Sequence, residues 1–281
     1  MCNKITAIIV TYNPDIYRFE KVISAVSEVS DSTIIVDNNS ANIQYIKEVI
    51  GKVPRGDINF IELGRNAGVA GALNTGLDFL TKQNGYVLTM DQDSILLISR
   101  NELEEMIYNA KQISDNNFGA LSLSHNSGTS NNLLPVEIPF TIISGMVIDI
   151  SLFHNGLKYR EDFFMDQVDF DLCYNIRDMG KKIFITSKKT MDHILGTRVS
   201  RFGKELTVEP DWRIYLLLRN STILLRERKI GAKFYLGQIL YILGSRILGT
   251  RFGTNIRLPK VIVTGLYDGI TRHIRNNYKF S

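Results

Sequence analysis

The chain has 281 residues, of which 44% are hydrophobic and 22% are charged, with a net charge of +4. This composition excludes a disordered or fibrous protein, and the length suffices for one large domain or for a domain with an appendage. Two cysteines, Cys2 and Cys173, are too few for a disulfide framework and lack zinc-site spacing, which favours a reducing, cytoplasmic location. We expect no signal peptide, and no stretch reaches the roughly 20 apolar residues of a membrane span.

The charge is unevenly distributed along the chain. From Arg226 to Ser281, eleven Lys and Arg residues stand against two acidic residues, which gives this tail +9 and leaves −5 for residues 1–225. A basic tail on an acidic body indicates an anionic partner, either a membrane surface or nucleic acid. The alternative is a solvated basic face without a partner.

Strand and helix patterns alternate through the first ninety residues. Short β-branched apolar runs predict strands, and longer stretches with apolar residues at helical spacing predict helices. The predicted strands are Ile5–Thr11, Thr33–Val36, Asn59–Leu63 and Tyr86–Met90, and the helices between them are Asp15–Val29, a stretch ending near Ile50, and Ala67–Leu80. This alternation predicts βαβ units and a mostly parallel central sheet flanked by helices.

The pattern is looser after Asn101. The predicted elements are a helix to about Gln112, strands at Phe118–Leu123, Thr141–Ile150 and Lys182–Ser187, a helix at Val168–Met179 capped by Gly180, and two helices from Asp211 to about Gly249 broken near Gly231. The polar segment His125–Asn132 predicts a mobile loop. We expect an α/β domain over residues 1–210 and a basic helical region over residues 211–281.

Three polar clusters follow predicted parallel strands, where open sheets of this class bind ligands. They are Thr11-Tyr12-Asn13, Asp37-Asn38-Asn39 and Asp91-Gln92-Asp93. Asp and Asn are also ordinary turn residues, so each cluster alone has a structural explanation. In extended backbone, the side chains of Asp91 and Asp93 point the same way, and two converging carboxylates favour a hard cation such as Mg²⁺ or Mn²⁺.

Two further segments are candidates for the site. The loop Gly64–Gly71 lacks the G-x-G-x-x-G of a dinucleotide site, but its small residues could bring backbone N–H groups close to a phosphate or ribose; a tight packing turn is the alternative. A second acidic cluster contains Glu161, Asp162, Asp166, Asp169 and Asp171. Asp169 lies at the start of a predicted helix, where it is either a cap or a general base. His193 follows a predicted strand, and a lone histidine is more often structural than a ligand.

Together these segments resemble the family 2 glycosyltransferases of the GT-A fold. The motifs that carry the resemblance are AIIVTYN, IIVDNNS, GRNAGVAGALNTGL, YVLTMDQDS, SGMVID, FFMDQVDFDLC and DHILG, which cover roughly residues 4–225. The DQDS motif and the later DWRIYLLLRN stretch are similar to bacterial rhamnosyltransferases that use dTDP-L-rhamnose. The resemblance implies a GT-A catalytic domain over residues 1–210, with the helical region appended.

The resemblance also implies a role for each candidate residue. Beside the nucleotide would lie Thr11, Tyr12 and Asn13, and Asp37 would bond its base. The pocket would be lined by Arg65, Asn66 and Gly68, with Asn74 supporting it, and Asp91, with Gln92 beside it, would face the ribose or metal. Asp93 and His193 would hold a Mg²⁺ or Mn²⁺ ion, and Asp169 would be the catalytic base. The family often has Glu-Asp at the base position, whereas Val168 precedes Asp169 here, so Asp166 or Asp171 could compete for that role.

The implied reaction is an inverting transfer from a nucleoside-diphosphate sugar to a hydroxyl of a glycan or lipid-linked glycan, as in bacterial O-antigen and related surface polysaccharides. Another UDP- or dTDP-sugar is the alternative donor. The tail helix Lys229–Leu248 combines apolar residues with cations, which suits an anionic membrane surface and a peripheral location on the inner face of the plasma membrane; core packing or a homodimer is the alternative.

Rival functions have less support from the sequence. A nucleotidyltransferase would carry a Gly-rich, basic loop after the first strand, where this chain has TYNPD. A nucleic-acid-binding module would use the basic tail, but no basic and aromatic interleaving supports it, and we expect no nucleic acid partner. A catalytically idle scaffold of the same fold would be excluded by measurable donor turnover.

Overall fold

The structure, a computed structural model, describes residues 4–53, 57–80, 83–124, 134–192, 198–201, 204–250 and 257–274, with the backbone alone at 198–201 and 204–207. The predicted mobile loop His125–Asn132 lies outside the described residues, as does Cys2. The chain divides into two compact units. We call Met1–Phe164 with Val168–Ile194 the sheet unit, and Met165–Gln167 with Leu195–Ser281 the helical unit.

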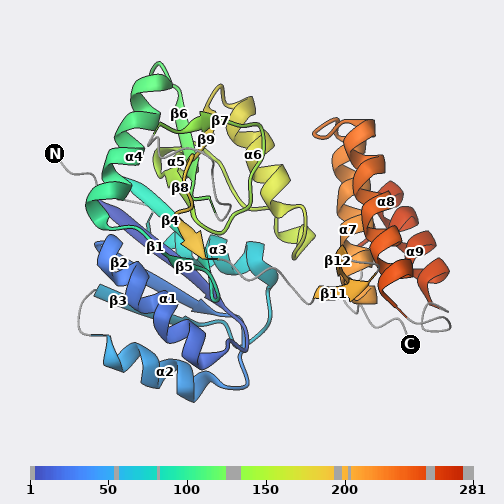
Figure 1. The fold of residues 1–281 in the computed structure, drawn as a ribbon, viewed down its shortest axis with the longest axis horizontal. Coiled ribbons are helices and arrows are strands. Elements are labelled where there is room, and N and C mark those ends of the chain that lie inside the picture. The colour runs from blue at the N-terminus through green and yellow to red at the C-terminus, as the bar shows by residue number, and fades with distance from the viewer. Residues whose placement is uncertain are drawn as a thin grey trace. The chain divides into compact units, whose positions relative to one another are not determined.

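The sheet unit is built on an eight-stranded sheet in the order β3-β2-β1-β4-β8-β6-β9-β7 (Figure 1). The strands are β1 Ile5–Thr11, β2 Ser32–Asp37, β3 Asp57–Glu62, β4 Tyr86–Asp91, β6 Phe118–Ser122, β7 Val136–Glu137, β8 Met146–Asp149 and β9 Lys182–Ile185. β3, β2, β1 and β4 pair in parallel, as do β6 and β9, whereas β8 runs antiparallel between β4 and β6. The predicted mostly parallel sheet is confirmed.

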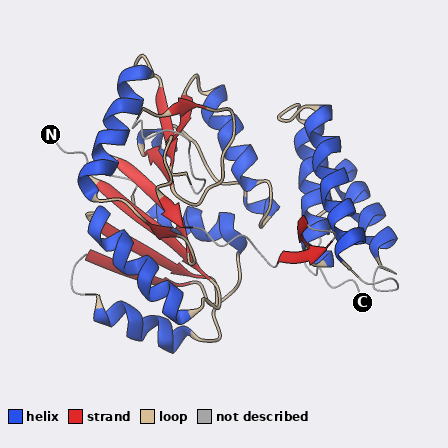
Figure 2. Cartoon of the chain, viewed as in Figure 1, coloured by secondary structure: helices blue, strands red, loops and turns tan. Residues whose placement is uncertain are grey.

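Helices cover both faces of this sheet (Figure 2). They are α1 Ile16–Val29, α2 Ile43–Lys52, α3 Gly68–Asp78, α4 Arg100–Ile113, α5 Ser151–His154 and α6 Val168–Asp178, with a 3₁₀ turn, η1, at Glu161–Phe163. Alternate residues of β1 serve opposite layers: Ile9 belongs to the core cluster that α1, α2 and α4 share, whereas Ile8 lies against Gly76 of α3. Because both faces are covered, β1 reads as a continuous apolar run rather than an alternating one.

Two details differ from the sequence prediction. The strand expected over Thr141–Ile150 begins only at Met146, because Gly145 adopts a left-handed φ of +74° that breaks extended structure before it. A short pair, β5 Ile95–Leu96 with β10 Met191–Asp192, was not predicted and joins segments almost 100 residues apart. The predicted cap at Gly180 is confirmed by its φ of +73° after α6.

The helical unit contains a hairpin, β11 Arg198–Arg201 with β12 Lys204–Thr207, and the helices α7 Asp211–Arg226, α8 Ala232–Gly249 and α9 Leu258–Thr271. The predicted break near Gly231 is confirmed, because α7 ends before it and α8 begins after it. α9 packs closely on α7 through two glycines. A Cβ atom on Gly265 would lie 3.0 Å from Leu218 Cβ, and one on Gly269 would lie 2.6 Å from Thr222 Cβ. Within the described residues, no helix is long and apolar enough to cross a membrane.

Candidate active site

The three predicted polar clusters lie at one edge of the sheet. Thr11, at the end of β1, pairs with Asp37 at the end of β2, and Asp91 at the end of β4 pairs with Val10 of β1. Since these strands are parallel, their carboxyl ends meet at the same edge, where open α/β sheets bind ligands. The structure therefore brings the clusters together as neighbours.

Thr11 and Asp37 form a buried polar network beneath this edge. The Thr11 hydroxyl donates to Asp37 Oδ1 at 2.8 Å. The Ser40 hydroxyl donates to the same oxygen at 2.5 Å, and the Ser40 backbone N–H donates to Oδ2 at 2.8 Å. Because Thr11 and Asp37 are fully buried, these bonds fix the loops that follow β1 and β2. The contact of Asp37 with a nucleotide base stays a prediction.

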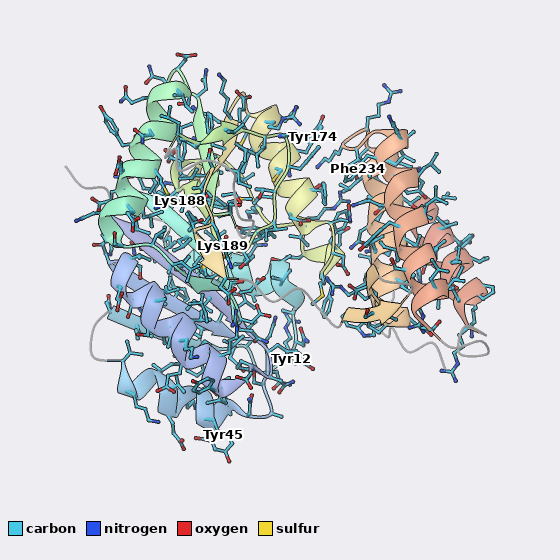
Figure 3. The ribbon with its side chains drawn as sticks, in the orientation of Figure 1. Tyr12, Tyr45, Tyr174, Lys188, Lys189 and Phe234 are labelled. Carbon is cyan, nitrogen blue, oxygen red and sulfur yellow. The ribbon has the colours of Figure 1, made fainter. Side chains whose placement is uncertain are left out.

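Two side-chain amides clasp the loops at this edge. Gln92 Oε1 accepts from the Tyr12 backbone N–H at 2.6 Å, and Gln92 Nε2 donates to the Tyr12 carbonyl at 3.1 Å. The Tyr12 ring is left 48% exposed, free to lie against a ligand (Figure 3). Asn13, at a left-handed φ of 48°, accepts from the Ala41 N–H at 2.7 Å and so joins the β1 and β2 loops.

The second amide is that of Asn38, which holds the small-residue loop. Its Nδ2 donates to the Gly68 carbonyl at 2.9 Å, and its Oδ1 accepts from the Ala67 N–H at 2.9 Å. Asn66 Oδ1 accepts from the Gly68 N–H at 3.0 Å. Gly68 has a φ of +74°, and a Cβ atom there would lie 2.3 Å from the Phe164 carbonyl oxygen. The loop is therefore a tight packing turn that can still present backbone to a ligand.

Arg65 and Asn74 lie on either side of this turn. Arg65 is exposed, and within the described residues no hydrogen bond or ion pair holds its guanidinium. The Asn74 amide is engaged on both sides, because Oδ1 accepts from the Tyr159 N–H at 3.0 Å while Nδ2 donates to the Tyr159 carbonyl at 2.9 Å and to Glu161 Oε1 at 2.8 Å. Asn74 thus anchors the segment that leads into the second acidic cluster.

The acidic motif Asp91-Gln92-Asp93 is held in place through its backbone atoms, which leaves the Asp93 carboxylate available for a ligand. The Asp93 carbonyl accepts from Arg18 Nε at 2.6 Å, and the Asp91 N–H donates to Ser144 Oγ at 3.1 Å. Asp93 and Gln92 line a hollow of about 450 Å³ together with residues of α1. In the described part of the chain, the Asp93 carboxylate has no hydrogen-bond or ion-pair partner.

Arg18 also reaches the segment that precedes His193. Its Nη2 donates to the Asp192 carboxylate at 3.0 Å, and this bond lowers the pKa of Asp192 below its usual value. Asp192 pairs with Ile95, two residues beyond Asp93, through β10 and β5. His193 itself lies outside the described residues, so its role as a metal ligand stays a prediction.

The donor set at this edge fits a hard divalent cation. No group of three His, Cys, Asp or Glu side chains within the described ranges could hold a metal by itself. Mg²⁺, however, is usually bound by one or two carboxylates together with substrate phosphates. Asp93 meets that requirement, because it lines a hollow and its carboxylate has no partner in the part of the chain that the structure describes.

Three aspartates of the second acidic cluster differ in their burial and in their partners. Asp171 is 3% exposed and bonded by Asn175 at 3.0 Å, and Asp166 is 10% exposed and paired with Arg213 at 3.2 Å. Asp169 lies in the first turn of α6 and is partly exposed, with Oδ1 accepting from the next backbone N–H at 2.9 Å. Asp171 is buried and Asp166 is paired with Arg213, whereas Asp169 is partly exposed at the start of α6, which favours it as the group that reaches a substrate.

Sequence reasoning missed the residues that hold the site from a distance. Arg18 lies on a helix face with no motif to mark it. Ser144 and Asn220 belong to the SGMVID and DWRIYLLLRN motifs, but the sequence analysis gave neither residue a role. Asn38 carried a signal as a member of a cluster of strand-end polar residues.

The comparisons with known proteins can be set beside this geometry. The family model described as glycosyl transferase family 2 matches residues 6–174. The dTDP-rhamnosyl transferase RfbF of Shigella flexneri is 27% identical over 294 residues, covering 96% of each chain.

Solved structures are similar in fold. The mannosyltransferase PcManGT from Pyrobaculum calidifontis, in complex with GDP-Man and Mn²⁺, matches with a TM-score of 0.55 and 15% identity over 97% of this chain and 75% of that one. TarS 1-349 from S. aureus, in complex with UDP-GlcNAc, matches with a TM-score of 0.58 and 14% identity over 95% of this chain and 81% of that one. At these identities the likeness establishes the fold alone.

Proposed function

The chain belongs to glycosyltransferase family 2 and has the GT-A fold, and from this we propose that it transfers L-rhamnose from dTDP-L-rhamnose to a hydroxyl of a lipid-linked or oligosaccharide acceptor. The observation that carries the proposal is the shared sheet edge of Thr11, Asp37 and Asp91, which gathers the polar loops after β1, β2 and β4. The similarity to a dTDP-rhamnosyl transferase supports the choice of donor. Another UDP- or dTDP-sugar is the alternative.

The donor is held by groups that the chain fixes in advance. Tyr12, whose backbone is held by the Gln92 amide, offers its exposed ring to the nucleotide, and Arg65 offers a cation with no partner among the described residues. Asn66 and Gly68 line the pocket through the turn that Asn38 holds. Preorganised donors of this kind lower the cost of ordering the site when the ligand binds.

Asp169 is the general base of the transfer. It removes the proton of the acceptor hydroxyl as that oxygen attacks the anomeric carbon, and the bond from this carbon to the diphosphate oxygen breaks. A single in-line displacement inverts the configuration, so a β-L-rhamnosyl donor gives an α-L-rhamnoside. Asp93 and His193 would hold a Mg²⁺ or Mn²⁺ ion, which when bound would supply positive charge for the departing diphosphate.

The chemistry is tested by Asp169→Asn. The variant removes the proton acceptor with little change in shape, so transfer should fall by about 10²- to 10⁴-fold while calorimetric affinity for dTDP-L-rhamnose stays unchanged. Asp93→Ala is its counterpart, because it should abolish only the Mn²⁺-dependent part of that affinity. Wild-type turnover in Asp169→Asn would remove this residue from the reaction, and tighter binding of a UDP-sugar would replace the donor.

We also propose that the helical unit places the enzyme on an anionic membrane surface. α8 exposes six large apolar residues: Phe234, which Figure 3 labels, with Leu236, Leu240, Tyr241, Ile247 and Leu248. α9 exposes Val263, Tyr267 and Ile270 at helical spacing, a stripe that the sequence reading missed. Exposed Lys233, Arg257 and Lys260 lie on the same two helices and their starts. Apolar faces flanked by cations are typical of interfacial helices.

Vesicle flotation tests this surface. The full chain should float with vesicles that contain anionic lipid, and the double variant Leu240→Ser, Tyr241→Ser should not. The matched control is Tyr45→Ser with Phe79→Ser, which removes two equally exposed aromatic residues from the sheet unit. If the protein fails to float and sedimentation shows that the double variant turns a dimer into a monomer, a second copy of the chain covers this face instead.

A further inference from the structure

A three-residue segment of the helical unit directly precedes the helix that carries the predicted base, Asp169. Met165–Gln167 belongs to the helical unit, although Phe164 before it and Val168 after it belong to the sheet unit. Val168 begins α6, and Asp169 is the second residue of that helix. The conformation of this segment therefore sets where the first turn of α6 begins.

The segment has a backbone conformation that it would not keep unaided. Asp166 has a φ of 46° and Gln167 a φ of 68°, and Phe164 just before them has a φ of 62°. Left-handed conformations are unfavourable for residues with a Cβ atom, and such residues persist only where surrounding contacts hold them. Gln167 is also 5% exposed, with an Oε1 that lacks a partner among the described residues.

The contacts that hold the segment come from one helix, α7. Asn220 Nδ2 donates to the carbonyls of Met165 and Asp166, each at 2.9 Å. The amide is itself oriented, because Arg219 Nη1 donates to Asn220 Oδ1 at 2.8 Å. Asn220 is fully buried, so its two bonds to the segment are shielded from water.

Arg213, two turns earlier on α7, holds the Asp166 side chain. Its Nε lies 3.2 and 3.3 Å from the two carboxylate oxygens, and its Nη1 donates to Glu209 Oε2 at 3.1 Å. Burial raises the pKa of Asp166 to about 6, against the opposing effect of Arg213, while Glu209 raises it further. The charged pair thus forms fully only above that pH.

We propose that α7 positions the catalytic base: Asn220 and Arg213 clamp Met165–Gln167, and this clamp fixes the first turn of α6 and hence the Asp169 carboxylate. The inference rests on the proposed role of Asp169. Arg213, Asn220 and Asp166 are positioning residues, because they act through the backbone that leads to Asp169.

The proposal predicts a dependence on pH that belongs to the clamp. As pH falls through about 6, Asp166 takes up a proton, its pairing with Arg213 weakens, and kcat should fall. Arg213 and Glu209 are the charged groups that act on Asp166. The step belongs to the clamp if it disappears when Asp166 is replaced. Donor KM should stay level across it, because the donor is bound at the sheet edge.

The experiment compares Asp166→Asn, Arg213→Ala and Arg213→Lys by kcat, donor KM and pH profile. Arg213→Ala should lower kcat about tenfold with donor KM unchanged, because a small displacement of a reacting group costs that much or more. Neither Arg213→Ala nor Asp166→Asn can form the charged pair at any pH, so both variants should lose the acid limb of kcat that belongs to the clamp. Arg213→Lys keeps the positive charge and should recover part of kcat.

The control is Arg226→Ala, an arginine of the same helix that donates to the Ile270 carbonyl and does not contact the clamp. It should keep the wild-type kcat and pH profile. Arg213→Ala and Asp166→Asn with wild-type kcat, or with a lower kcat but the wild-type acid limb, would overturn the proposal. If these variants behave as wild type while Asp169→Asn is inactive, only the clamp fails; an active Asp169→Asn would instead defeat the proposed base.

Discussion

The two units differ in where their large apolar side chains are exposed. In the sheet unit, exposed large apolar residues are scattered over separate elements, such as Tyr45 of α2 and Tyr108 of α4. In the helical unit, α7 and α9 bury Arg219, Asn220 and Asp268, whereas α8 and α9 expose apolar side chains, among them Leu240 at 71%.

This difference indicates that the two units present different kinds of surface to their ligands and partners. Buried polar groups of α7 have partners within the helical unit, as where the Tyr215 hydroxyl donates to Asp268 Oδ2 at 2.8 Å. The exposed apolar side chains of α8 and of α9 have no comparable cover among the described residues, and exposed apolar patches mark interaction surfaces. The sheet unit thus presents polar loops to a ligand, while the helical unit presents an apolar surface.

The largest effect is expected from two leucine truncations in the helical unit, one at a buried position of α7 and one at an exposed position of α8. Leu218→Ala removes a fully buried side chain of α7 and should lower the free energy of unfolding by about 2 to 5 kcal/mol. Leu240→Ala on α8 should change it by less than about 0.5 kcal/mol. The single tryptophan of the chain, Trp212 of α7, reports unfolding of this unit by fluorescence in urea. Equal losses would mean that the face on α8 is packed in solution.

In the sheet unit, the corresponding test is the close approach at Gly68. Gly68→Ala combines a left-handed φ with a Cβ atom 2.3 Å from the Phe164 carbonyl, so it should cost about 2 to 4 kcal/mol and weaken donor binding. Gly64→Ala is the matched control, because its φ of +65° is similar but nothing lies within 4 Å. Urea unfolding followed by circular dichroism measures both. Similar losses would show that conformation, not the contact with Phe164, sets the cost.

A hydroxyl deletion tests whether the buried polar groups of the helical unit stabilise it. Tyr215→Phe leaves Asp268 without one donor in a fully buried site and should cost about 1 to 3 kcal/mol. Tyr267→Phe, on the exposed face of α9, should be neutral. Trp212 fluorescence in urea again separates the two variants. A neutral Tyr215→Phe would indicate that Asp268 is satisfied by its other partners.

The smallest effect is expected from a surface ion pair of the sheet unit. Lys188, labelled in Figure 3, donates to Glu102 Oε1 at 2.7 Å, and mainly through this bond the pKa of Glu102 is lowered to about 2. A lowered carboxylate pKa stabilises the fold above pH 4.5, and this contribution is lost as pH falls from 4.5 towards 2. Lys188→Ala should therefore cost less than about 1 kcal/mol near neutral pH.

The cost of Lys188→Ala should vanish near pH 2 and shrink in about 1 M salt, which screens exposed charges. The control is Lys181→Ala, since Lys181 donates to the Asn116 carbonyl rather than to a carboxylate. Circular dichroism in urea at several pH values gives the comparison. A difference that persists at pH 2 would assign the effect to packing of the lysine stem.

Local sequence patterns predicted most strands and helices of the sheet unit. The β-branched runs Ile5–Thr11 and Tyr86–Met90 became parallel strands, and the polar residues after them met at one edge, because strand direction follows from βαβ connections. The apolar spacing of Phe19, Val22 and Val26 gave the buried face of α1.

α9 shows where local patterns fail. Gly265 and Gly269 weaken the helix signal of its sequence, because glycine is a poor helix former. In the folded chain the same glycines let α9 approach α7 more closely than any side chain would allow. Glycine is thus unfavourable for the helix itself but is required by the close packing of α9 on α7, a contact that cannot be recognised in the sequence.

The sequence by itself determined the family, the order of strands and helices along most of the sheet unit, and the strand-end carboxylates, since each depends on residues close together in the chain. The tertiary structure alone decided which aspartates of the second cluster are paired or buried. Asp166, Asp169 and Asp171 are equivalent as local sequence, but Arg213, 47 residues away, pairs with the first, and burial encloses the third. Such choices depend on packing between distant segments, which fixes burial and partners only when the chain has folded.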